Sequence, residues 1–173
     1  MKMTYYKLGN LCDVVSGGTP SRSKQEYWKN GTIPWVKISN IKGKYVSEVD
    51  EYITVDGLSN SSAKILVKGT IIYTIFATLG EVGILEMDAC TNQAIAGITI
   101  KNDTIINRGY LYYYLKSKKN YVNNLGRGVA QNNINMSILR QFKVPTPAIE
   151  KQIAIVKTLE KVENILIKRK YQL

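Results

Sequence analysis

The C-terminal end of the chain carries the pattern that most restricts the fold, an apolar stripe at the spacing of one helix face. From residue 148 onward, apolar side chains recur every three or four residues, and charged side chains lie mostly between them. The stripe consists of Ile149, Ile153, Val156, Leu159, Val162 and Leu166. A long helix of this kind needs a hydrophobic partner, because packing of the apolar face supplies most of its stability. We expect helix–helix association, within or between chains; the alternative is that the stripe packs back onto its own domain.

A proline-rich segment, Val144–Pro147, separates this helix from the rest of the chain. Thr146 is predicted to be the N-cap and Pro147 to occupy the first helical position. The sequence therefore divides into a globular domain over residues 1–147 and the start of a pairing helix over residues 148–173.

The middle of the chain is rich in β-branched residues, which favour strands. Strands are predicted at Gly69–Ile75, Gly83–Leu85 and Ala94–Ile100, each bounded by glycine or a polar residue. Ile33–Ile38 is also strand-like, and its proline is typical of an edge strand or a strand start.

Helical spacing appears in three places outside the C-terminal stripe. Leu8–Val15 and Met136–Phe142 predict short helices, and Arg108–Leu125 predicts a longer one. The tyrosines of Tyr110–Tyr114 could stack on bases, but packing against a sheet explains them more simply. The expected fold class is α+β, a mixed β-rich domain with flanking helices, followed by one long helix for helix–helix pairing.

The charge is strongly positive and unevenly distributed. Twenty-four basic residues against 13 acidic ones give a net charge of +11. Residues 17–47 carry six cations against the single acid Glu26, and residues 104–149 contain no acid. This excess predicts a polyanionic partner, which could be DNA, RNA or an anionic membrane surface. A solvated basic surface is the alternative, but the uneven distribution favours binding.

Several classes of chemistry are disfavoured. The chain has no histidine, which removes the commonest general base and metal ligand. Phosphate-binding loops and dinucleotide-binding motifs are missing, and the isolated Cys12 and Cys90 suit buried positions better than a metal site. We therefore expect no catalytic residues, no metal and no cofactor. The sequence shows neither a membrane-spanning apolar run nor a signal peptide, so we expect a soluble, cytoplasmic protein.

The segment Gly126–Asn135 combines two glycines around an arginine with a run of amides. Glycine lets the backbone approach closely, arginine attracts phosphate, and amides can read base edges. Arg127 is predicted to be a phosphate clamp. A glycine-rich turn in an asparagine-rich protein explains the segment equally well.

A series of short motifs runs through the chain in a fixed order. They are Ser16-Gly17-Gly18-Thr19-Pro20-Ser21, Tyr27-Trp28, Gly31-Thr32-Ile33-Pro34-Trp35-Val36, Lys68-Gly69-Thr70, Ala77-Thr78-Leu79-Gly80, Thr91-Asn92-Gln93-Ala94, Tyr113-Tyr114-Leu115, Gly128-x-x-Gln131-x-x-Ile134 and Val144-Pro145-Thr146-Pro147-x-Ile149-Glu150-x-Gln152. Each motif is short, but the ordered series covers almost the whole chain. It resembles a target recognition domain from the specificity subunit of type I restriction-modification systems.

That resemblance implies a subunit without chemistry of its own, which reads double-stranded DNA and holds two methyltransferase subunits; restriction subunits join to form the nuclease. A full subunit carries two recognition domains separated by long helices that act as a ruler between two half-sites. This chain has one domain and the start of one helix, so the resemblance implies a half-subunit that pairs with itself or another chain, or a fragment. Glu150-Lys151-Gln152 also departs from the adjacent Glu-Gln of typical members.

Polar side chains on loops are the candidates for DNA contact. They are Ser21, Arg22, Ser23, Lys24, Lys37, Ser39, Asn40, Lys42, Lys44, Thr78, Asn92, Gln93, Arg127, Gln131, Asn132 and Asn133. Residues shared across a family cannot distinguish different targets, so Lys37–Tyr52, between the motifs, is the favoured reading segment. Asn92 and Gln93 are somewhat better explained as bonds that hold the sheet together. The alternative function is a non-specific module for RNA or an anionic surface.

Overall fold

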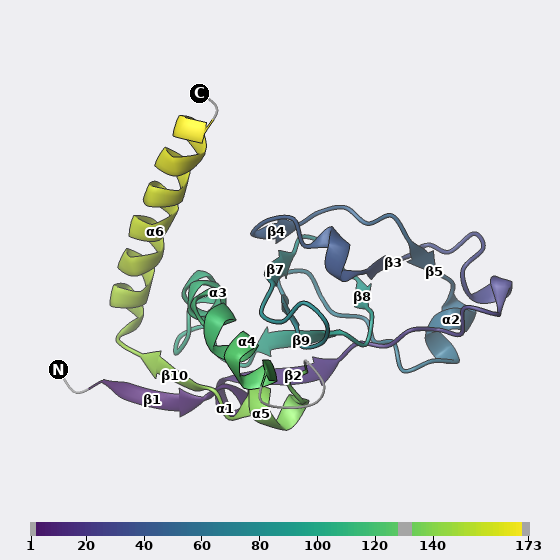
Figure 1. Cartoon of the computed structure of the whole chain (residues 1–173), viewed down its shortest axis with the longest axis horizontal. Coiled ribbons are helices and arrows are strands. Elements are labelled where there is room, and N and C mark those ends of the chain that lie inside the picture. The colour runs from purple at the N-terminus through teal and green to yellow at the C-terminus, as the bar shows by residue number, and fades with distance from the viewer. Residues whose placement is uncertain (1–2, 128–132, 171–173) are drawn as a thin grey trace.

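A five-stranded sheet lies at the centre of the molecule (Figure 1). The computed structural model describes residues 3–127 and 133–170, without side-chain detail for 125–127 and 170. The strand order of the sheet is β2 (Cys12–Ser16), β9 (Ile95–Ile100), β6 (Ile71–Thr74), β7 (Val82–Leu85) and β4 (Tyr45–Val46). Neighbouring strands are antiparallel except β4 and β7, which are parallel.

Both faces of the central strands β6, β7 and β9 are buried, which explains why these strands are apolar runs, whereas the edge strand β2 alternates between buried and exposed residues. In β6, Ile71 and Tyr73 belong to the larger core, whereas Ile72 belongs to a second core on the opposite face. The three strands predicted in the middle of the chain are confirmed as β6, β7 and β9. The expected α+β class is confirmed as well.

Helices cover the face of the sheet that carries the larger core (Figure 1). They are α1 (Leu8–Leu11), α3 (Arg108–Ser117), α4 (Lys119–Arg127) and α5 (Met136–Arg140). The helix predicted over Arg108–Leu125 is broken at Lys118, whose amide bonds to the carbonyl of Leu115 and tightens the last turn of α3. Tyr110 and Tyr112 are buried, so these tyrosines pack in the core as expected.

A lobe of loops and short strands extends from the far end of the sheet (Figure 1). It contains β3 (Ile33–Val36) between β5 (Tyr52–Ile53) and β8 (Cys90–Thr91), with the 3₁₀ turn η1 (Gln25–Tyr27) and α2 (Val55–Ser59). We call residues 17–37, 50–64 and 90–93 the distal lobe. Its small core consists of Trp35, Ile53, Ala63 and Cys90.

Two segments differ from the sequence-based expectations. Leu8–Val15 forms one helical turn and then strand β2, because five residues from Cys12 onward pair with β9. Its apolar spacing fits either structure, and the tertiary pairing decides between them. Val144–Pro147 overlaps strand β10 (Lys143–Thr146), which pairs antiparallel with β1 (Thr4–Lys7). Pro145 is tolerated there because a two-stranded sheet consists of edge strands.

The predicted N-cap of the long helix is also wrong. The hydroxyl of Thr146 donates to the carbonyl of Val144 at 3.1 Å, so it does not cap a helix. Helix α6 (Ile149–Lys170) begins only after Ala148. Since strand β10 includes Thr146, the chain has to leave the sheet before it can turn into the helix.

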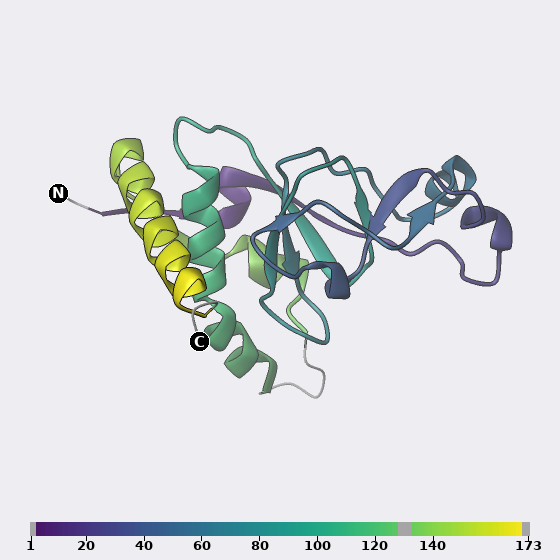
Figure 2. The same cartoon turned by 90° about the horizontal axis from the view of Figure 1, so that it is seen from above.

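Helix α6 lies beside α3 and is fastened at its N-terminal end (Figure 2). The fully buried side chain of Gln152 accepts from the amide of Asn107 at 2.8 Å and donates to the carbonyl of Ile105 at 2.9 Å. One turn further, Val156 packs so closely on α3 that a Cβ at Gly109 would lie 3.0 Å from its Cγ1.

The apolar stripe of α6 divides into a covered part and an exposed part. Ile149 and Val156 are half-buried, and Ile155 packs against the larger core, so the stripe packs partly on its own domain. The other large apolar side chains of the helix are exposed by 37–60%, and they are Ile153, Leu159, Val162, Ile165, Leu166 and Ile167.

Two consecutive glycines join the distal lobe to the sheet. The amides of Gly17 and Gly18 donate to the carbonyls of Ile95 and Thr91 at 3.0 and 2.8 Å. A Cβ on Gly17 would overlap the backbone oxygens of Thr91 and Asn92, and one on Gly18 would overlap the backbone of residues 62–63. The close approach of three chain segments therefore requires glycine at both positions.

We expect Gly18→Ala to destabilise the domain by about 1–3 kcal/mol or more, because the added methyl group overlaps backbone that cannot rotate away. The matched control is Gly43→Ala, since a Cβ at Gly43 meets no atom within 4 Å. Denaturant unfolding followed by circular dichroism measures both changes. Equal unfolding midpoints for the two variants would contradict this account of the junction.

Candidate nucleic-acid interface

The predicted contact residues of the first loop lie together at the tip of the distal lobe. Ser21, Arg22, Ser23 and Lys24 are all exposed, directly before η1. The hydroxyls of Ser21 and Ser23 are 2.9 Å apart, and the ammonium of Lys24 donates to the hydroxyl of Tyr27 at 3.0 Å. The loop thus presents cations and hydroxyl groups from a folded support.

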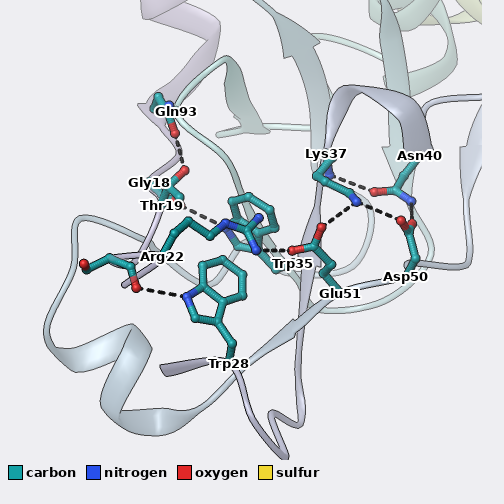
Figure 3. A network of polar contacts seen from close by, with 11 residues as sticks. Gly18, Thr19, Arg22, Trp28, Trp35, Lys37, Asn40, Asp50, Glu51 and Gln93 are labelled. Carbon is teal, nitrogen blue, oxygen red and sulfur yellow. Dashed lines mark hydrogen bonds and ion pairs between the residues drawn. The ribbon is translucent and has the colours of Figure 1, made fainter. Parts of the chain in front are cut away.

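Arg22 is held on aromatic rings (Figure 3). Its guanidinium carbon lies 3.6 Å from the ring centroid of Trp28 and 4.7 Å from that of Trp35. The two rings meet edge to face with centroids 5.0 Å apart. Their indole nitrogens donate to the carbonyls of Ser21 and Gly18 at 3.1 and 2.9 Å, which fixes the rings to the loop they support.

Lys37 and Arg22 converge on the carboxylate of Glu51 (Figure 3). One oxygen of Glu51 lies 2.5 Å from Nη1 of Arg22, and the other lies 2.5 Å from Nζ of Lys37. The same ammonium lies 2.8 Å from Asp50. Asn40 accepts from the amide of Lys37 at 2.8 Å and donates to Asp50, so the 3₁₀ turn η2 (Ile38–Asn40) is part of the network.

These contacts stabilise the ionised carboxylates. Hydrogen bonds from Lys37 and then Asn40 lower the pKa of Asp50 to about 2. Partial burial raises the pKa of Glu51, but hydrogen bonds from Lys37 and Arg22 outweigh it, so the pKa lies below its usual range. The sequence had indicated the cations but not their acidic partners.

The segment after Lys37 is divided between two environments. Ser39, Asn40 and Lys42 line an open hollow of about 420 Å³ together with Tyr45 and Asp50. Lys42 is exposed and has no ion pair among the described residues. This hollow is where the structure brings predicted contact residues of the favoured reading segment together.

Lys44 points elsewhere. Its ammonium forms an ion pair with Glu160 of α6 at 2.5 Å, and only 14% of its side chain is exposed. The rings of Tyr112 and Tyr113 lie 5.5 and 4.9 Å from the same ammonium. A DNA contact by Lys44 would therefore compete with a bond that ties the central sheet to the helix.

A second polar contact holds α6 about three turns of helix beyond Gln152. Glu163 accepts from the hydroxyl of Tyr113 at 2.7 Å and from the ammonium of Lys116 at 2.9 Å. We call Lys44, Tyr113, Lys116, Glu160 and Glu163 the helix clamp. Near its N-terminal end, α6 is held against the domain by apolar packing. Further along the helix, the hydrogen bonds and ion pairs of the helix clamp fix its direction.

Asn92 and Gln93 are engaged within the protein. The side-chain oxygen of Asn92 accepts from the amide of Ala94 at 3.1 Å, and Gln93 accepts from the hydroxyl of Thr19. Asn92 is half-buried next to Gly17. These contacts favour the interpretation in which the Thr91-Asn92-Gln93 motif holds the lobe onto the sheet.

The remaining candidates lie far from Arg22 in sequence. Thr78 is exposed in a loop where Ala77 has a φ of 60°, an uncommon value for a residue with a side chain. Asn133 is half-buried and forms a backbone bridge with Phe76, whose ring is 48% exposed; sequence reasoning missed Phe76. Arg127 ends α4, and its side chain lies outside the described residues, as do Gln131 and Asn132 entirely.

Other chemistries find no support in the described part of the chain. Over residues 3–127 and 133–170, no group of three or more His, Cys, Asp or Glu residues could hold a metal ion. Burial raises the pKa of Cys12 to about 12 and that of Cys90 to about 11, which leaves both thiols protonated near neutral pH. None of the described helices is long and apolar enough to cross a bilayer.

The fold is shared with solved specificity subunits of type I restriction-modification systems. The HsdS subunit of Thermoanaerobacter tengcongensis superposes with a TM-score of 0.77 at 18% sequence identity, over 98% of this chain and 39% of that one. A chain from a structural study of complex assembly in a type I system gives a TM-score of 0.80, again at 18% identity, over 98% of this chain and 40% of the other.

The chain belongs to the family of type I restriction modification DNA specificity domains, whose model matches residues 1–173. The specificity subunit of the type I restriction enzyme MjaIX from Methanocaldococcus jannaschii is 31% identical over 171 residues, covering 96% of this chain and 39% of the relative. The EcoR124I/EcoR124II specificity subunit of Escherichia coli is 27% identical, covering 91% and 40%. The chain thus spans about two fifths of the length of these relatives, and the family resemblance is confirmed.

The two tryptophans of the network are the only ones in the chain, so their fluorescence reports on it directly. Because the pKa of Glu51 is lowered by folding, its stabilising contribution is complete above about pH 4.3, the usual value for Glu, and is lost as the pH falls through the lower folded value. We expect constant emission from pH 7 to about 4.5 and a change below that.

Glu51→Gln is the control for this titration, because it removes the titrating group while keeping a similar shape. Circular dichroism at each pH separates the local change from global unfolding. An emission change with the same midpoint in the variant would show that Glu51 does not control the environment of the tryptophans.

Proposed function

We propose that this chain is the part of a type I specificity subunit that reads one half of a split DNA target. In this proposal it carries no catalytic residue, and partner methyltransferase subunits, with restriction subunits where present, supply the chemistry in the cytoplasm. The observation that carries the proposal is the distal lobe, where exposed cations and amides extend from a rigid support at the end of the molecule opposite α6 (Figure 1).

The residue types in and beside this lobe suit direct reading of a duplex. Arginine can donate two hydrogen bonds to guanine, and asparagine can pair with adenine, whereas exposed lysines contact phosphates and set the register. We assign base contact to Arg22, and base or phosphate contact to Lys42. Arg127 remains our candidate for a phosphate clamp. Family membership favours DNA over the RNA or anionic-surface alternative.

The exposed apolar face of α6 supports pairing with another helix. Its distal half presents large apolar side chains that are 37–60% exposed, so pairing could add roughly half of the about 1.5–3 kcal/mol that complete burial of a leucine-sized side chain contributes. We propose that residues 148–173 pair with the corresponding helix of a second recognition domain, in a second copy of this chain or in a longer chain, and thereby set the distance between two half-sites.

Methylation mapping tests the reading role. Cells that express this chain with its methyltransferase subunit should gain a two-part methylated motif in single-molecule sequencing, and cells with the methyltransferase subunit alone should not. A palindromic motif is expected if two identical copies pair. The proposal is contradicted if the assembled complex methylates without any sequence preference, or if it binds RNA as well as duplex DNA.

Charged substitutions test the pairing role of α6. Val162→Glu together with Leu166→Glu should abolish self-association in sedimentation velocity, because both side chains lie on the exposed face and have no described tertiary contact to lose. Lys157→Glu with Lys161→Glu changes more charge on polar positions of the same helix and serves as control. Unchanged association of the first pair, or equal loss in both pairs, would show that the apolar face is not the contact.

A further inference from the structure

Two cations of the distal lobe, Arg22 and Lys37, are paired with carboxylates. Arg22 is paired with Glu51, and Lys37 with both Glu51 and Asp50, so these four side chains carry no net charge together (Figure 3). Among the described residues, the neighbouring cations Lys24, Lys29 and Lys42 form no ion pair, although Lys24 bonds to Tyr27 and lies within the field of Glu26. The pairing is therefore selective in a protein that has an excess of 11 positive charges.

Stability explains only part of this pairing. Arg22 and Asp50 are more than half exposed, and exposed ion pairs contribute only about 0–1 kcal/mol, whereas the pair of Lys37 and Glu51 is less exposed, at 28% and 27%. The rings of Trp28 and Trp35 also lie against the guanidinium and help to orient it. If Glu51 and Asp50 served only to stabilise the fold, their contribution would therefore be small.

Electrostatics distinguishes two kinds of acceptor that could approach Arg22. A phosphate meets the carboxylate of Glu51 beside the guanidinium and is repelled by it, and neutralising a cation that is already paired releases little counterion. A base edge is uncharged and avoids that repulsion. Arginine has five N–H donors, and the described contact with Glu51 uses Nη1, which leaves further donors for a neutral acceptor.

We propose that Glu51, assisted by Asp50, is a specificity-determining residue that suppresses phosphate contact by Arg22 and Lys37 and reserves these cations for acceptors on base edges. The inference rests on the proposed DNA-reading function and deepens it. The unpaired lysines of the same region supply the sequence-independent attraction, and the paired cations supply discrimination. This proposal assigns a function to the two acidic residues at the end of the favoured reading segment, Asp50 and Glu51, in a protein proposed to bind a polyanion.

The test compares Glu51→Gln and Asp50→Asn with wild type in the complex assembled with its methyltransferase subunit. Both changes remove charge and keep the shape and a hydrogen-bond acceptor. Asp56→Asn is the matched control, because Asp56 is exposed on α2 of the same lobe, lies outside Lys37–Tyr52 and has no ion pair among the described residues. The probes are a duplex that carries the motif found by methylation mapping and a scrambled duplex of equal length, each titrated at several salt concentrations.

We expect Glu51→Gln to raise affinity for the scrambled duplex several-fold more than for the target duplex, so that the ratio of the two affinities falls. The log–log salt dependence of scrambled-duplex binding should steepen by about one, because Arg22 could then neutralise a phosphate while Lys37 stays paired with Asp50. Asp50→Asn should act in the same direction through Lys37 but more weakly, because Lys37 keeps its bond to Glu51, and Asp56→Asn should leave the ratio unchanged. Thermal melting checks that all variants remain folded.

Three outcomes overturn the inference. Equal loss of affinity for both duplexes would show that Glu51 only holds Arg22 in place, and an effect equal to that of Asp56→Asn would reflect net charge alone. If the wild-type complex prefers the target duplex and Glu51→Gln leaves the ratio of the two affinities unchanged, the inference is overturned and the proposed function stands. A wild-type complex that prefers neither duplex overturns the proposed function itself.

Discussion

The close approach of Gly17 and Gly18 to two other segments holds the distal lobe in place. The lobe has only a small core of its own, so its position relative to the sheet depends on this junction. There the amides of Gly17 and Gly18 bond to the carbonyls of Ile95 and Thr91, and no side chain separates the backbone segments. Everything that the lobe presents depends on it, including the carbonyl of Gly18, which orients Trp35 and, through that ring, Arg22. Residues that hold the lobe and residues that present contacts are thus different residues.

This separation allows the exposed contact surface to change without loss of the fold. The motif glycines and the Thr91-Asn92-Gln93 turn make internal contacts, whereas the exposed side chains at the lobe tip and around η2 are free to differ. The fold can therefore keep its junction while the surface chemistry changes.

Much of the fold could be predicted from local pattern. The three central strands are dominated by β-branched residues, and the sheet that buries them on both faces needs that composition. The prediction failed where local spacing was ambiguous and pairing between distant segments decided. Leu8–Val15 has spacing compatible with a helix, but β2 pairs with β9 about 80 residues later in the chain, and Pro145 concealed a strand that pairs with the N-terminus.

The candidate site was predictable only in part, for the same physical reason. Cationic residues can be identified from the sequence because charge is a property of the residue, but their ion-pair partners depend on the fold. Glu51 lies 29 residues from Arg22 and 14 from Lys37, and Glu160 lies 116 residues from Lys44. The tryptophans that support Arg22 were noted only as motif residues, since ring stacking leaves no periodic signal in sequence.

The helix clamp couples two properties that are usually treated as separate, namely what a recognition domain contacts and where its helix points. Lys44 belongs to the segment between motifs, yet it bonds to Glu160. At about 1.5 Å per residue, the 22 residues of α6 form a lever of roughly 33 Å. A tilt of about 10° at its base would move the tip by roughly 6 Å, close to two base-pair steps of about 3.4 Å. Under the proposed function, exchange of the segment that carries Lys44 would then shift the position of the second half-site along the duplex, even with a helix of unchanged length.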